Sequence, residues 1–240
     1  MTVRTAGISP QPYARICGVL YLYIVVVGIF AAQVRSKLVV PADPAATAGN
    51  ILANESLFRL AFAGELLQLA FDVAIAMLLY VLLRPVNRNI ALLAAFMRLA
   101  CAIVLGVASI AHFAALRLIK GADYLAAFQT AQLHDLAVLS MRLHEDGYGI
   151  ALVFFAFACL SLGYLIFRSG YLPRTLGALM AIAGVGYLVN SFASFLDPVF
   201  ASRLFPAILM PALVAELSLA LWLTIKGVDT AKWAVGGETR

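Results

Sequence analysis

The chain has 240 residues, of which 64% are hydrophobic and 12% charged, and its mean hydropathy is +0.98. Soluble domains hold roughly 45–50% apolar and 25% charged residues, because polar side chains must cover their surface, so a water-soluble globule is excluded. The net charge of +5 comes from bases that flank apolar stretches without stacking aromatics, which fits lipid headgroups and argues against nucleic acid as a partner.

Six apolar stretches follow one another along the chain, each close to the ~20 residues that cross ~30 Å of hydrocarbon as a helix. Because a backbone in lipid must satisfy its own hydrogen bonds, we predict that all six are helices. The prediction is an all-α, six-transmembrane-helix bundle that forms a single integral membrane domain over residues 1–240. The spans run from Ala14 to Ala32, Leu60 to Leu83, Ile90 to Leu116, Gly149 to Phe167, Leu176 to Leu196 and Phe205 to Ile225.

Charges between the spans predict the orientation of the bundle. The side that holds both termini carries nine Lys or Arg against two acids, whereas the opposite side has seven of each. Loops rich in Lys and Arg stay in the cytoplasm. Both termini are therefore expected to be cytoplasmic, in a multi-pass protein of the bacterial inner membrane.

The first two loops on the outer side are long enough to hold structure of their own. Between Gln33 and Arg59, prolines favour turns, and Asp43 or Thr47 is placed to cap a short helix. Between the third and fourth spans, an apolar stripe predicts an amphipathic helix that forms an outer cap or lies on the membrane surface. The stripe consists of Leu125, Phe128, Leu136, Leu139 and Leu143.

Several strings along the chain carry a resemblance to a known family. They are Arg15–Leu22, Leu79–Arg88, Phe154-Phe155, Gly163–Arg174 and Glu216–Trp222. Together they resemble the bacterial multi-helix integral membrane proteins grouped as domain of unknown function 4386. The likeness covers nearly the whole chain and implies one integral membrane domain. It implies no activity, and it brings no catalytic or ligand-binding residue to this sequence.

Four ionisable side chains fall inside the apolar stretches, namely Glu65, Asp72, Arg98 and Glu216. Each costs at least ~2.5–3.5 kcal/mol to insert unless it finds a partner or water. Counted from the cytoplasmic ends at ~1.5 Å per residue, the last three lie ~15–18 Å deep. We expect Arg98 to pair with Asp72 and Glu216 to remain as a second acceptor or a titratable acid. The alternative is an ion pair that only pins three helices together.

A second polar group is expected in the outer half of the bundle, where His112, His144 and Asn190 frame an outward-facing pocket. The histidines and Glu65 are metal-compatible residue types, but no pair has the spacing that defines a metal motif. The sequence therefore predicts no metal site and no cofactor, and ordinary hydrogen-bonded histidines are favoured.

These observations favour a small-molecule-binding or transport-like role over an enzymatic one, with the bilayer and a small-molecule or lipid ligand as partners. One alternative is an intramembrane or lipid-modifying enzyme that works at the outer face through His112, His144 and Glu65. Metal in the purified protein that is lost in His112→Ala would favour it. The other is a structural subunit of a membrane complex, which would tolerate neutralisation of its buried charges.

Overall fold

The computed structural model describes residues 9–40 and 42–238, and this part of the chain is helical without strands. Six helices among these residues are long and apolar enough to cross a membrane, which confirms the predicted all-α class. They are α1 (Pro10–Leu38), α3 (Glu55–Leu83), α4 (Arg88–Lys120), α5 (Thr130–Ser169), α6 (Arg174–Leu196) and the segment Ala207–Ile225, which joins the short turn η2 (Ala207–Leu209) to α8 (Met210–Ile225). Shorter helices are α2 (Pro44–Ala53), η1 (Asp123–Leu125), α7 (Pro198–Leu204) and α9 (Thr230–Glu238).

The six long helices form a closed ring. Each packs against the next in chain order, α1 on α3, α3 on α4, α4 on α5, α5 on α6 and α6 on α8, and α8 returns to α1. Large apolar side chains such as those of Val26, Ile103, Val107, Ile110 and Val185 are exposed on the surface. An apolar exterior of this kind is stable only in lipid. The chain is therefore a multi-pass membrane protein whose polar groups must lie inside the ring or at its ends.

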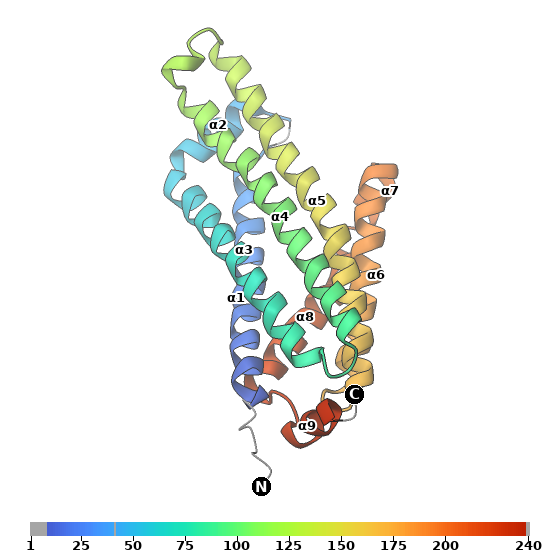
Figure 1. Ribbon diagram of the computed structural model, residues 1–240. Coiled ribbons are helices and arrows are strands. Elements are labelled where there is room, and N and C mark those ends of the chain that lie inside the picture. The colour runs from blue at the N-terminus through green and yellow to red at the C-terminus, as the bar shows by residue number, and fades with distance from the viewer. Residues whose placement is uncertain (1–8, 41, 239–240) are drawn as a thin grey trace.

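The start of α1 and helix α9 lie at the same end of the bundle (Figure 1). Gln11 at the start of α1 donates to the Lys226 carbonyl at 2.8 Å, and the Trp233 indole of α9 donates to the Leu82 carbonyl of α3 at 2.9 Å. At the start of α9, the backbone N–H and the ammonium of Lys232 hold the pKa of the Asp229 carboxyl below its usual value. The first of these contacts ties the start of α1 to the end of α8, and the second ties α9 to the end of α3.

The helices extend past the predicted spans, most of all in α5. At ~1.5 Å per residue its 40 residues reach ~60 Å, about twice the hydrocarbon thickness. The amphipathic segment before the fourth span is helical as predicted, but from Thr130 on it is the first part of α5 and not a separate surface helix. Its buried face is made by Leu133, Ala137 and Met141, whereas Leu139 and Leu143 of the predicted stripe are exposed.

Two other local predictions meet different outcomes. Asp43 caps α2 as predicted, since its carboxylate accepts a hydrogen bond from the Ala46 backbone at 2.8 Å. The last span, predicted to start at Phe205, becomes α-helical only at Met210. Pro206 precedes the η2 turn and Pro211 occupies the first turn of α8, a position where the missing backbone N–H costs nothing.

Glycines let α5 and α6 approach closely. A Cβ built on Gly163 would lie 2.8 Å from the Gly177 carbonyl oxygen, and one built on Gly177 would lie 2.6 Å from the Phe167 backbone nitrogen. Gly184 is packed as tightly, 2.8 Å from the Ala156 carbonyl oxygen. With larger side chains at these positions the two backbones would have to lie farther apart. Small residues allow the same close approach in other pairs of membrane helices.

We expect Gly177→Ala to lower the free energy of unfolding by about 1–3 kcal/mol, because the added methyl group overpacks the α5–α6 contact. The readout is the thermal unfolding midpoint in detergent. Gly49→Ala in α2 is the matched control, since a Cβ there meets nothing within 4 Å and alanine favours the helix. Equal midpoints for the two variants would contradict the tight contact.

Candidate functional site

The side chain of Arg98 is buried inside the ring and pairs with Asp72. Its Nη2 lies 2.7 Å from Asp72 Oδ1, and its Nη1 donates to the Tyr21 hydroxyl oxygen at 3.3 Å. The guanidinium also stacks over the rings of Tyr21 and Phe155, with its Cζ 4.6 and 5.1 Å from their centroids. Arg98 thus joins residues of α1, α3, α4 and α5 at one point, and Asp72 cancels its charge.

Glu216 of α8 approaches the same point from the other side of the ring. Its carboxylate accepts a hydrogen bond from the Tyr187 hydroxyl of α6. A cavity of about 160 Å³ lies beside both pairs, and Asp72, Arg98 and Glu216 all line it. The structure therefore brings together the three side chains for which the sequence predicted a common depth.

The wall of this cavity includes polar atoms that lack partners within the described part of the chain. Arg98 Nε and Gln68 Oε1 are both buried and have no hydrogen-bond partner there. A buried polar group without a partner costs about 1–3 kcal/mol, so such groups are usually satisfied by water or a ligand. The cavity can accordingly accommodate polar occupants.

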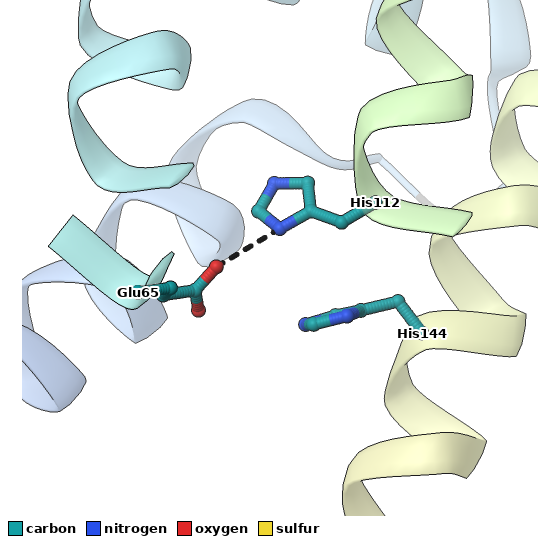
Figure 2. Close-up of side chains that lie close together, drawn as sticks. All are labelled: Glu65, His112 and His144. Atoms are coloured by element: carbon teal, nitrogen blue, oxygen red, sulfur yellow. Dashed lines mark hydrogen bonds and ion pairs between the residues drawn. The ribbon is translucent and has the colours of Figure 1, made fainter. Parts of the chain in front are cut away.

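Glu65, the fourth predicted charge, lies in a different cluster. Its two carboxylate oxygens are held separately, Oε1 by the guanidinium of Arg35 and Oε2 by His112 Nδ1 at 3.0 Å. Figure 2 shows that His144 comes from a third helix and lies beside this pair. The rings of His112 and His144 have centroids 4.8 Å apart. The structure thus assigns Glu65 to the histidines and not to Asp72.

The predicted outer pocket is present next to this cluster. It has a volume of about 770 Å³ and is lined by His144, Asn190 and Arg35, among others. His112, the third residue predicted for it, is fully buried behind His144 and packs edge-on against Phe58. Two of the three predicted residues therefore reach the pocket directly.

Sequence reasoning missed two residues of these sites. The apolar pattern ends the first span at Ala32 and so places Arg35 in the outer loop, whereas α1 continues to Leu38 and keeps Arg35 in its last turn. The same pattern includes Tyr21 only as one member of an apolar run. The available signal was its hydroxyl, because a tyrosine in the middle of a span needs a partner for that group.

The ring and its buried polar groups define a polytopic α-helical membrane protein. The chain belongs to the family described as domain of unknown function 4386, whose model matches residues 16–227, and the resemblance noted in the sequence is thereby confirmed. It is also similar to an uncharacterised protein of Archaeoglobus fulgidus, 33% identical over 166 residues that cover 68% of this chain and 82% of the relative. No solved structure matches the chain.

We expect Asp72→Asn and Arg98→Gln each to destabilise the fold by about 3–5 kcal/mol, because each leaves one buried charge without its partner. The double variant is expected to lose less than the sum of the two single losses. The measurement is a double-mutant cycle of unfolding free energies in detergent. Arg84→Gln, an exposed position at the end of α3, serves as the control within about 0.5 kcal/mol of the wild type. Additive losses would contradict the coupling.

Proposed function

We propose that the protein binds a small polar molecule in the cavity inside its helix ring and has a transport-like role in the inner membrane, with both termini in the cytoplasm. The observation that carries this proposal is the cavity of about 160 Å³ lined by Asp72, Arg98 and Glu216. One water needs roughly 10–15 Å³ of such volume, so several waters or a small ligand fit. An ion pair that only pins helices requires no such space.

The charges around the cavity indicate what kind of molecule it favours. Asp72 already neutralises Arg98. Glu216 faces them with a hydroxyl as its hydrogen-bond partner and no cation within ion-pair distance in the described part of the chain. A ligand that carries a hydrogen-bond donor or a cationic group would therefore gain most from Glu216. The rings of Phe155 and Tyr187 add faces that attract cations.

The inner cavity and the outer pocket lie next to each other. Tyr148 and Leu152 of α5 line both the inner cavity and the outer pocket of about 770 Å³. Side chains of α5 therefore stand between the two spaces, and side chains change rotamer far more readily than helices move. This arrangement supports entry from the outer pocket past Tyr148.

The cavity predicts that Cys101 reacts with small water-soluble thiol reagents. Cys101 lines the cavity, whereas Cys17 and Cys159 are fully buried and are not among its lining residues. We expect a charged methanethiosulfonate reagent to label the wild-type protein at Cys101 and the Cys101→Ala variant hardly at all. Peptide mass spectrometry identifies the labelled site. A Cys101 that reacts no faster than Cys17 and Cys159 would argue against a water-filled cavity.

Proton exchange by the acids of the cavity gives a second test. Vesicles that contain the wild-type protein are expected to dissipate an imposed pH gradient faster than vesicles with Glu216→Gln, because the amide cannot bind and release a proton. An enclosed pH-sensitive dye reports the rate. Asp123→Asn, a change at an exposed acid of η1 that lines neither the cavity nor the outer pocket, is the control. A wild-type rate equal to that of protein-free vesicles would contradict a proton-exchanging role.

A further inference from the structure

Three side chains of the types that bind metals meet in the half of the bundle away from the termini. Glu65 lies in α3, His112 in α4 and His144 in α5, so three separate helices supply them (Figure 2). One ligand atom from each lies within 4.8 Å of the other two. Bonds of about 2.0–2.2 Å to zinc hold ligand atoms closer together than this, so the three side chains must move toward one another when the cation binds.

The two imidazoles have nitrogens without a partner. His112 and His144 are 1% and 2% exposed, and the Nε2 atom of each has no hydrogen-bond partner within the described residues. His144 Nδ1 lies 3.2 Å from the Ala108 carbonyl oxygen. A carbonyl only accepts hydrogen bonds, so Nδ1 must donate, and the neutral ring then carries its lone pair on Nε2. A lone pair buried in this way needs a proton donor or a cation.

The same tautomer is typical of histidines that bind metals. Such histidines almost always donate their second ring N–H to a carboxylate or a backbone carbonyl, which orients the ring. Glu65 fits the pattern as well, because Arg35 holds one of its oxygens and leaves Oε2 directed at His112. The outer contacts expected around a metal site are thus present for two of the three side chains.

We propose that Glu65, His112 and His144 bind one divalent transition-metal cation, with zinc as the best fit to the ligand set. Two imidazoles and one carboxylate suit zinc, whereas calcium and magnesium prefer oxygen ligands throughout. The cation takes the place of the proton between His112 Nδ1 and Glu65 Oε2, and the neutral His112 ring then carries its proton on Nε2. This site is separate from the polar cavity and stands or falls independently of the proposed binding function.

The proposed metal site has three protein ligands and lies beside the outer pocket, from which a cation can reach it. His144 lines the outer pocket, and the exposed acids Glu145 and Asp146 stand at the wall of that pocket, where they attract cations. A water molecule from the pocket can complete a four-coordinate site. Zinc sites with three protein ligands and one open position are of the catalytic kind, whereas structural sites have four protein ligands. Arg35 lowers the affinity for the cation through its charge but keeps Glu65 in place.

The test uses the full chain, purified in detergent with an affinity tag that contains no histidine, stripped with a chelator and then titrated with zinc chloride. We expect one tightly bound zinc per chain by elemental analysis, a higher unfolding midpoint with zinc, and visible absorption bands of a four-coordinate site when cobalt replaces zinc. His144→Ala and Glu65→Gln should each weaken zinc binding more than about 100-fold, beyond the 10–100-fold cost of losing an outer contact.

His134→Ala is the matched control, because His134 is also on α5 but is not part of the cluster. It should retain one zinc and the wild-type shift in unfolding midpoint. Wild-type protein that binds no stoichiometric zinc, or that shows no four-coordinate cobalt spectrum, would overturn the proposal and leave a hydrogen-bonded network of Arg35, Glu65 and His112. Equal zinc affinity in the wild type and His144→Ala would overturn it as well. The absence of a four-coordinate cobalt spectrum in the wild type overturns the proposed metal site even if a variant fails to fold.

Discussion

The ion pair between Arg98 and Asp72 is the interaction on which the interior of this protein depends. Arg98 is the largest side chain that is fully buried, and its charge lies in the middle of helices that otherwise contact lipid. Such a charge is tolerated only with a partner and hydrogen bonds, because the cost of desolvation exceeds what packing alone returns. Asp72 supplies the opposite charge and Tyr21 an acceptor. The register of α1, α3 and α4 is thereby fixed.

The polar groups of the bundle fall into two clusters with different chemistry. The inner cluster is built on carboxylates, a guanidinium and tyrosine hydroxyls around a cavity, and suits a ligand that exchanges hydrogen bonds. The outer cluster is built on imidazoles and one carboxylate, and suits a cation. Tyr148 and Leu152 are common to the walls of the inner cavity and the outer pocket. The inner cavity and the outer pocket are therefore adjacent.

Much of the fold was predictable because lipid imposes simple rules. Length and hydropathy predicted all six spanning helices, and the matched depth of Asp72, Arg98 and Glu216 predicted the inner cluster, since an unpaired charge in hydrocarbon is too costly. The ends of the helices were harder, because α1, α4 and α5 continue into the headgroup region or water, where hydropathy no longer marks them. Hydropathy therefore does not identify Arg35 as a residue of the last turn of α1. The sequence offers the grouping of Glu65 with His112 and His144 only as an alternative to a place beside Asp72. The rotation of α3, α4 and α5 decides between the two, and sequence spacing does not encode that rotation.

One close contact between two backbones has a consequence for the chemistry of the outer cluster. Gly147 lies one helical turn after His144, and a Cβ built there would stand 3.5 Å from the Ala108 Cα and closer still to its Cβ. The absence of a side chain at Gly147 therefore lets α5 settle against α4 until the Ala108 carbonyl reaches the His144 ring. The spacing of the α4 and α5 backbones thus determines that Nδ1 of His144 carries the proton. The Ala108 carbonyl fixes this tautomer without an acidic residue.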